Sequence, residues 1–589
     1  MKTNKIYIAT KYFSLSASII FLIFYIPLLI SANTDLIDGR FALFMDERIT
    51  FDGVQRIITP GGFTEFLLAV FDGGDHRYGR SLWNSLAIVS IIPNNLLGEG
   101  GQIVASRMLQ IILILASYSI ISFGLLQSWI LRFTLLVVVL LIPFSTYFMT
   151  IPKPEPLQLL FISIFFYFYI KSSTGFSWYW VFLGLAFGTK ISLLPILPLF
   201  VILSLIVSSK WSTSLVSIKS VSTAVFAFSL GLSIAVPILL PFVLLCSTGC
   251  YGIHRFYMQN ILKKSIITIF TFGYFCLVFY ICMGPIKTWL SSTILSTTHG
   301  SDRASINILS WFEFFVDHWM VSPYYINIIF LSLIVLYLIL QSIDLMSKKS
   351  FFVSDKTTAM VILIAGIFLN LTIMLFTNRL WGLYLFTGSI IAIFGMLILI
   401  DKDISDEPSA DEGCIFYITR YLGYLIIFML QFIAIYYWLP NVVNELRQYS
   451  VRTSKSEYLQ QYASYQEYST FLEHYVSDSD QPLFAMFSPW LFPPLSNDRY
   501  EIVEFYGPFN DWHKEPDIII FAKINTLTGG TWSKDSPLYE NFLKSRENYQ
   551  IHVIEKNDTC LKSPCYQREM ILPNGGELLT KKLSKPVQE

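Results

Sequence analysis

Apolar runs of about 20 residues recur along this chain, and they restrict its fold more than any other feature. A helix needs about 20 apolar residues to cross the hydrocarbon layer of a membrane. The alternating short segments of a membrane barrel are not visible. Charged residues make up only 14% of the chain and the mean hydropathy is +0.56, whereas soluble domains carry about 25% charged residues. The sequence therefore predicts an α-helical polytopic membrane protein.

The spanning helices are expected within residues 1–439, and we count about 11 to 13 of them. The count is open because residues 177–208 are long for one helix and short for two. This segment is either one tilted span or a hairpin with Lys190 at its outer tip. The expected spans are 13–31, 103–126, 131–149, 156–170, the segment 177–208, 219–247, 265–284, 324–345, 357–377, 381–400 and 415–438.

Basic residues indicate how the chain is oriented. Lys2, Lys5 and Lys11 precede the first apolar run, and positive residues mark the cytoplasmic side of a membrane helix. We therefore expect a cytoplasmic N-terminus and an extracytoplasmic first loop at residues 32–102. A cleaved signal peptide ending near residues 31–33 is the alternative, although the length of the run favours its retention.

Two acids, Asp46 and Glu47, follow the first predicted span. Carboxylates at the end of a membrane helix sit at the water boundary, where they stay ionised and can reach lipid headgroups. On its own, such a pair is more often a solvated loop or a helix cap than a catalytic group. The same loop contains two apolar segments, 63–71 and 81–97, which we expect to lie along the interface. Residues 98–101, rich in glycine, then turn the chain into the second span.

The chain changes character beyond Pro440, where residues 440–589 have the composition of a soluble domain. Helical periodicity marks residues 458–475. Strands are expected at 482–487, 516–521 and 549–554, so we predict a small extracytoplasmic α/β domain. Two cysteines within it, at positions 560 and 565, could form a disulfide or stay reduced.

The polar residues of the predicted outer side suit one kind of chemistry. Transfer of a sugar from a lipid phosphate carrier needs a carboxylate to deprotonate the acceptor hydroxyl, and cations or donors to stabilise the leaving phosphate. Asp46 or Glu47 could act as the base. Structural roles compete at each cationic position, such as a lysine that extends to the interface or a residue that caps a helix. The candidate phosphate-binding residues are His76, Arg77, Lys153, Lys190, His299 and Arg379.

Other ligands have weaker support in the sequence. A formal net charge of +0 gives no indication of nucleic acid as a partner. The chain has no HExxH, paired CxxC, Walker or GxGxxG motif, which fits a lipid-linked donor better than a nucleotide sugar. Asp46, Glu47 and Asp52 could supply oxygen ligands to a divalent cation, so no cofactor is certain.

The order of these features resembles the GT-C glycosyltransferases. The likeness covers roughly residues 10–210 and is to the branch that contains the protein O-mannosyltransferases and the aminoarabinose transferase of lipid A. It is carried by the basic N-terminus, the single span, Asp46-Glu47, the segment 80–84, the Gly98-Glu99 turn, Arg107 and the run 184–190.

This resemblance implies a polyprenyl-phosphate sugar donor and inverting transfer on the extracytoplasmic face of a bacterial cytoplasmic (inner) membrane. It also implies that Asp46 is the base, that Glu47 supports it, and that Lys190 lies near the carrier phosphate. The sequence departs from the family at residues 77–80, where relatives often show a Pro-Pro-Leu-Tyr-like run. The acceptor is therefore open and could be a lipid, a glycan or a protein.

Two other functions compete with a glycosyltransferase. A transporter or flippase for lipid-linked glycans would usually show paired halves with matching broken helices, whereas this chain has one polar loop near its start and a soluble tail. A glycan polymerase or ligase would be expected to have its main polar loop late in the chain. The asymmetry favours an enzyme.

Overall fold

The computed structural model describes most of the helical part of the chain and five strands of the tail. The described residues are 2–33, 45–71, 80–172, 176–211, 214–239, 308–319, 323–347, 355–377, 382–405, 414–452 and the strands. The chain divides into two compact units. The first comprises residues 1–34, 50–295 and 306–447, and the second comprises 35–49, 296–305 and 448–589.

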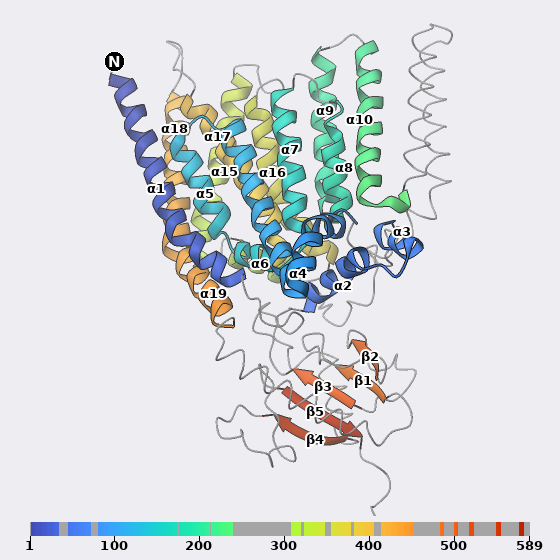
Figure 1. The fold of residues 1–589 in the computed structure, drawn as a ribbon. Coiled ribbons are helices and arrows are strands. Elements are labelled where there is room, and N and C mark those ends of the chain that lie inside the picture. The colour runs from blue at the N-terminus through green and yellow to red at the C-terminus, as the bar shows by residue number, and fades with distance from the viewer. Residues whose placement is uncertain are drawn as a thin grey trace, which may run out of the picture. The chain divides into compact units, whose positions relative to one another are not determined.

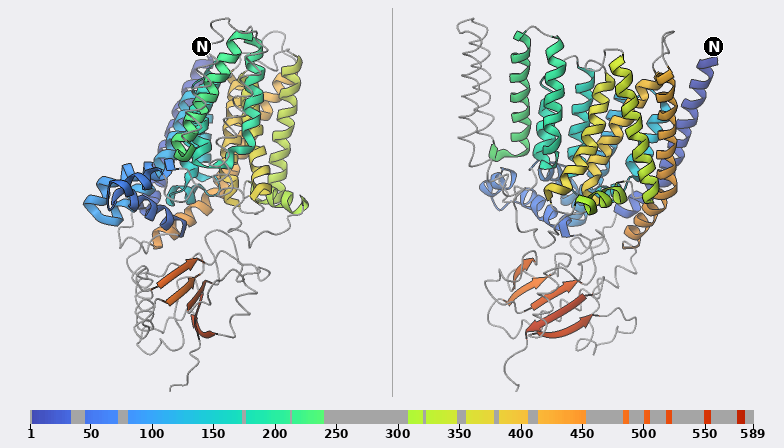
Figure 2. Two further views of the ribbon diagram at one scale, coloured as in Figure 1. Left: turned by 90° about the vertical axis from the view of Figure 1, so that its right-hand side faces the viewer. Right: turned by 180° about the vertical axis from the view of Figure 1, so that it is seen from behind.

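Long helices that run side by side form the first unit (Figures 1 and 2). From the N-terminus they are α1 (Lys2–Asn33), α2 (Met45–Ile58), α3 (Phe63–Phe71), α4 (Arg80–Leu125), α5 (Trp129–Leu141), α6 (Ser145–Thr150), α7 (Pro154–Lys171), α8 (Trp180–Thr189), η2 (Ile191–Ile196), α9 (Leu197–Trp211), α10 (Ser214–Ala235) and η3 (Pro237–Leu239). The later ones are α14 (Ile308–His318), α15 (Tyr324–Ser347), α16 (Asp355–Thr377), η5 (Gly382–Tyr384), α17 (Leu385–Ser405), α18 (Cys414–Ile433), the π-helical turn η6 (Ala434–Trp438) and α19 (Leu439–Arg452).

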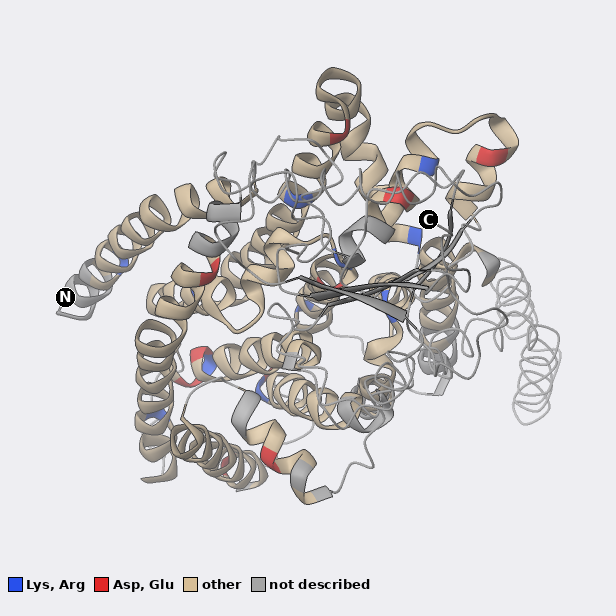
Figure 3. Ribbon diagram, turned by 90° about the horizontal axis from the view of Figure 1, so that it is seen from below, with Lys and Arg blue, Asp and Glu red and all other residues tan. Residues whose placement is uncertain are grey.

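Six of the described helices are long and apolar enough to cross a membrane: Thr10–Asn33, Arg80–Leu125, Tyr324–Met346, Asp355–Ile373, Leu385–Ser405 and Cys414–Leu446. Four shorter apolar helices accompany them. Charged positions are sparse along these helices (Figure 3). The chain is an integral membrane protein.

α17 lies at the centre of this unit, where 94% of its most apolar stretch is buried by other parts of the protein. Its neighbour α16 approaches closely because glycines stand at the contact. A Cβ added to Gly366 of α16 would lie 2.3 Å from the backbone nitrogen of Ala392, and one added to Gly395 of α17 would lie 2.3 Å from that of Leu363. Small residues of this kind let membrane helices pack backbone to backbone.

The structure resolves the choice left open at residues 177–208. The segment is a hairpin: α8 ends at Thr189, Lys190 has an extended backbone with φ −155° and ψ 126°, and η2 and α9 lead away from it. The predicted span 131–149 is interrupted, because Pro143 follows the end of α5 and Phe144 is left-handed with φ 68°. The predicted turn at Gly98 is confirmed, since its φ of 66° and ψ of −154° break α4 into two helical parts.

The described part of the second unit contains a five-stranded sheet of order β2-β1-β3-β5-β4. Its strands are β1 (Leu483–Phe487), β2 (Tyr500–Glu504), β3 (Ile518–Ala522), β4 (Tyr549–Ile554) and β5 (Gly576–Lys581). β1 pairs in parallel with β2 and β3, whereas β5 pairs antiparallel with β3 and β4.

Three of these strands, β1, β3 and β4, lie where the sequence predicted them, while β2 and β5 were missed. The predicted helix at 458–475 and the cysteines at positions 560 and 565 lie outside the described residues.

Candidate active site

The predicted site residues differ in how far the structure describes them. Asp46 and Glu47 occupy the first turn of α2, whose side chains are described from Thr50 onward. Lys153 and Lys190 are described with their side chains. The other four candidates, His76, Arg77, His299 and Arg379, lie outside the described residues.

α2 is fixed to α4 by a chain of amide groups. Gln55 of α2 donates through Nε2 to Oε1 of Gln102 at 2.5 Å and to Oδ1 of Asn94 at 3.3 Å. Gln102, which is fully buried, donates in turn to the carbonyl oxygen of Phe51 at 3.3 Å. A hydrogen bond between buried neutral groups contributes about 1 kcal/mol. Together these bonds hold the rotation of α2 as well as its position.

Close packing supports the same contact. A Cβ added to Gly53 would lie 2.4 Å from ring carbons of Trp83, so only glycine lets α2 rest on that indole ring. These contacts belong to the face of α2 that packs against α4. The buried residues of that face are Thr50, Phe51, Gly53, Val54 and Ile57.

Lys190 joins α8 to the first turn of α7. Its Nζ forms an ion pair with Oε1 of Glu155, and the two side chains are 17% and 6% exposed. Gln158, fully buried one turn further along α7, donates to the carbonyl oxygens of Ala186 at 3.1 Å and of Lys190 at 2.6 Å. The Lys190 ammonium also lies 5.6 Å from the centroid of the Tyr384 ring. These contacts set the place of Lys190 at the tip of its hairpin.

α7 begins at a proline-rich turn that suits a helix start. Lys153 is the residue before the helix, and proline occupies the first helical position, where a missing N–H costs nothing. The N–H of Lys153 donates to Oε1 of Gln110 on α4 at 3.5 Å. Arg107 lies one turn before Gln110 on the same side of α4 and is only 4% exposed.

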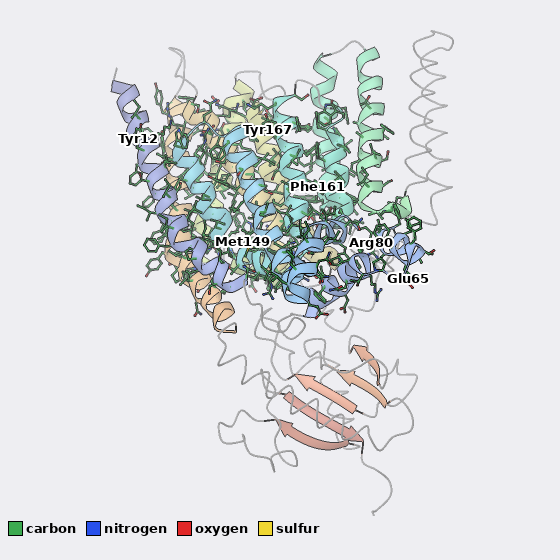
Figure 4. All side chains as sticks on the ribbon, viewed as in Figure 1. Tyr12, Glu65, Arg80, Met149, Phe161 and Tyr167 are labelled. Atoms are coloured by element: carbon green, nitrogen blue, oxygen red, sulfur yellow. The ribbon has the colours of Figure 1, made fainter. Side chains whose placement is uncertain are left out.

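The start of α4 contacts the end of α8 and carries a further buried cation. Ser81 Oγ and Thr189 Oγ1 are hydrogen-bonded at 2.9 Å, which joins this start to the end of α8. Arg80, labelled in Figure 4, is 4% exposed and its guanidinium carbon lies 4.3 Å from the centroid of the Trp83 ring. Arg80 therefore sits between the α2 contact and the hairpin of Lys190.

Four cationic residues and one carboxylate thus lie on, or within one turn of, the contacts between α4, α7 and α8: Arg80, Arg107, Lys153, Lys190 and Glu155. We call these residues, together with Gln110 and Gln158, the α7 cluster. Sequence reasoning singled out only Lys153 and Lys190 as phosphate-binding candidates within it. Cationic side chains gathered in this way are the groups that can bind a phosphate.

A second polar cluster lies at the far end of α17. Asp403 accepts hydrogen bonds from Tyr337 and Gln341 through Oδ2 and forms an ion pair through Oδ1 with Lys356 at 2.9 Å. Asp401 accepts the backbone N–H groups of Gln127 and Ser128 before α5, both at 2.8 Å. Seventeen residues of helix separate Asp401 from Tyr384, so the two clusters are roughly 25 Å apart.

Metal binding is not indicated by the part of the chain that the structure describes. No group of three or more His, Cys, Asp or Glu residues in it could hold a metal ion. A divalent cation bound by Asp46, Glu47 and Asp52 stays a prediction, since the side chains of the first two are not described.

Comparison with known proteins gives little beyond these residues. No protein-family model and no curated protein matches the sequence. Among solved structures, the chain is similar to ArnT from Cupriavidus metallidurans bound to undecaprenyl phosphate, with 11% identity and a TM-score of 0.37 over 98% of this chain and 99% of that one. A TM-score this low does not establish a shared fold, so the function proposed below rests on this chain's own residues.

Proposed function

We propose that this protein is a membrane glycosyltransferase that moves a sugar from a polyprenyl-phosphate carrier to a lipid, glycan or protein acceptor. The observation that carries the proposal is the α7 cluster, in which four cationic residues and one carboxylate lie at one end of membrane helices. α2, which begins with Asp46 and Glu47, is fixed to the same helix α4. A base beside a cationic phosphate site is what such a transfer requires.

Asp46 is assigned as the general base and Glu47 as the group that supports it. Asp46 takes the proton of the acceptor hydroxyl while the acceptor oxygen attacks the anomeric carbon of the sugar. The bond from that carbon to the phosphate oxygen breaks, and its electron pair stays with the phosphate. Attack opposite to the leaving group inverts the configuration of the anomeric carbon.

The cationic residues stabilise the leaving polyprenyl phosphate. Lys153, half-buried before α7, lies at the first turn of that helix, and the buried Arg107 lies one turn from Gln110, which contacts the backbone of Lys153. Lys190 is assigned to the same phosphate as a point charge. Its ion pair with Glu155 holds it in one place and offsets part of its charge.

The site is assigned to the extracytoplasmic face. The N-terminal lysines and Arg132, which donates to the carbonyl oxygen of Leu126 at 2.8 Å, belong to the opposite end of the helices. His76, Arg77, His299 and Arg379 stay candidate phosphate ligands from the outer loops. Reporter fusions after residue 452 should give an extracytoplasmic signal, and a cytoplasmic signal would reverse this assignment.

Transfer can be tested with purified protein in detergent, supplied with labelled polyprenyl-phosphate mannose, glucose, galactose or arabinose. We expect release of free polyprenyl phosphate together with a glycosylated product from a membrane extract. The Asp46→Asn variant should lose about a thousandfold in rate, within the range for a general base. Glu65→Gln is the matched control, because Glu65 is an exposed acid of the same loop that accepts only the N–H of Gly61 at 2.8 Å.

Two results would contradict the proposal. Wild-type transfer by the Asp46→Asn variant would remove Asp46 from the base role. Movement of intact lipid-linked sugar across vesicles, without release of polyprenyl phosphate from any donor, would favour a flippase. A product of repeating units would instead favour a polymerase.

A further inference from the structure

Gln110 and Glu155 of the α7 cluster each have a buried side-chain atom with no hydrogen-bond partner among the described residues. These atoms are Nε2 of Gln110 and Oε2 of Glu155. Gln110 is fully buried and Glu155 is 5% exposed. Because buried polar groups are nearly always hydrogen-bonded in folded proteins, each atom indicates a partner outside the described residues, and a bound ligand is one such partner.

The orientation of the Gln110 amide follows from its one contact. The N–H of Lys153 can only donate, and it lies 3.5 Å from Gln110 Oε1. The amide oxygen must therefore face the start of α7, which leaves the NH₂ group as the free donor.

Glu155 presents the opposite chemistry. Its Oε1 accepts from the Lys190 ammonium in an ion pair, and the second oxygen of such a carboxylate is an acceptor. Glu155 lies two residues after Lys153, whose backbone contacts Gln110. A free donor and a free acceptor thus border the same first turn of α7.

This combination distinguishes between classes of ligand. An anion could accept a hydrogen bond from Gln110 but would be repelled by the Glu155 carboxylate. A cation would be attracted to the carboxylate but could accept no hydrogen bond from Gln110. A hydroxyl group both donates and accepts, so it is a neutral group that satisfies both atoms, as a water molecule also would. We propose that Gln110 and Glu155 form a subsite that recognises hydroxyl groups of the transferred sugar. This inference rests on the proposed function and adds to it the residues that select the sugar.

The subsite can be tested with donors that each lack one hydroxyl. After the sugar that the wild type transfers is found among the four polyprenyl-phosphate donors, its monodeoxy analogues are compared by kcat/KM. We expect one analogue to fall by roughly 10- to 100-fold in the wild type, because it leaves a buried partner unpaired. Gln110→Leu and Glu155→Gln should lower kcat/KM for the parent sugar by a similar factor. Neither variant should lose further activity with that analogue.

Control measurements separate recognition of the sugar from loss of structure. Affinity for polyprenyl phosphate without a sugar should stay within about twofold of wild type in Gln110→Leu, because the proposed contact is to the sugar. Gln431→Leu is the matched control, since Gln431 donates to Thr134 at 2.7 Å on helices α18 and α5 and should keep the discrimination. If Gln110→Leu does not fold, Glu155→Gln carries the test alone, because it keeps the size of the side chain.

The two proposals fail in different ways. If the wild type transfers a sugar and both variants discriminate against each analogue as strongly as the wild type does, the subsite is overturned. The glycosyltransferase proposal is unaffected by that result. A wild type that transfers no sugar from any of the four donors would overturn both.

Discussion

The two polar clusters of the helical unit differ in how completely their carboxylates are bonded. At the far end of α17, both oxygens of Asp401 accept backbone N–H groups, and both oxygens of Asp403 have partners. In the α7 cluster, Glu155 has one oxygen paired with Lys190 and the other without a partner among the described residues. A carboxylate with both oxygens bonded joins helices, whereas one with an oxygen left over can accept a further hydrogen bond. The comparison concerns the carboxylates, because the α17 cluster also holds an amide oxygen, Oε1 of Gln341, without a partner among the described residues.

The largest expected effect is on the reaction itself. Asp46→Asn should lower transfer by about a thousandfold while leaving the unfolding temperature unchanged. The assay is the release of polyprenyl phosphate, with thermal unfolding measured on the same sample. A parallel fall in unfolding temperature would show that Asp46 stabilises the fold, as Asp401 and Asp403 are expected to do.

The reverse pattern is expected at the far end of α17. Asp403→Asn leaves the ammonium of Lys356, whose side chain is 11% exposed, without its buried counter-ion. Breaking a buried ion pair costs about 3 to 5 kcal/mol. The variant should unfold at a lower denaturant concentration, yet the fraction that stays folded should transfer the sugar with an unchanged KM. A changed KM would show that the cluster at the far end of α17 influences substrate binding.

Lys190→Met tests the α7 cluster, and its expected effect is on binding of the carrier. It removes a positive charge from the proposed phosphate site and leaves the Glu155 carboxylate buried without its partner. We expect affinity for polyprenyl phosphate to fall by roughly 10- to 100-fold, since a charged hydrogen bond contributes about 1.5 to 3 kcal/mol. Titration with the sugar-free carrier measures this directly. Unchanged carrier affinity would limit Lys190 to holding α7 and α8 together.

Gln102→Leu should have a smaller effect. The variant lacks the amide that forms hydrogen bonds with Gln55 and Phe51, so α2 can rotate against α4. We expect kcat to fall roughly tenfold with KM for the carrier nearly constant, because a misplaced base slows the reaction without altering phosphate binding. A rise in KM alone would argue against positioning of the base through this contact.

The smallest effect is expected at the surface. Lys402 and Asp355 are paired at 2.7 Å, but their side chains are 25% and 52% exposed. Exposed ion pairs contribute about 0 to 1 kcal/mol. Lys402→Met should therefore change neither transfer nor the denaturant midpoint measurably, and a clear loss of stability would show that exposure is a poor guide to the importance of these pairs.

The sequence predicted the helices well because long apolar runs are a local signal. α7, α15, α16 and α18 lie close to their expected bounds. The interruption between α5 and α6 was missed although Pro143 was visible, since hydropathy alone does not mark a left-handed residue such as Phe144.

Contacts across the chain could not be predicted in the same way. The pair of Lys190 and Glu155 joins residues 35 positions apart, and the sequence gives no sign of which acid a given lysine meets. Glu155 was visible only as part of a proline-rich turn. Likewise Gln110 lies within an apolar run, where an amide reads as an isolated polar residue until the start of α7 is seen beside it. β2 and β5 were missed because their sequences include Glu501, Glu504 and Glu577, which interrupt the apolar runs expected of a buried strand.

The burial of α17 has a consequence for biosynthesis. α5 and α16 leave the ribosome before α17, yet their packing surfaces, including Gly366, are shaped to receive it. A nascent chain that has not reached residue 385 therefore contains helices whose packing surfaces for α17 are still uncovered. Packing of the helices around α17 is therefore completed only after the fifth of the six described spanning helices is made, and a truncation upstream of α17 removes a buried helix.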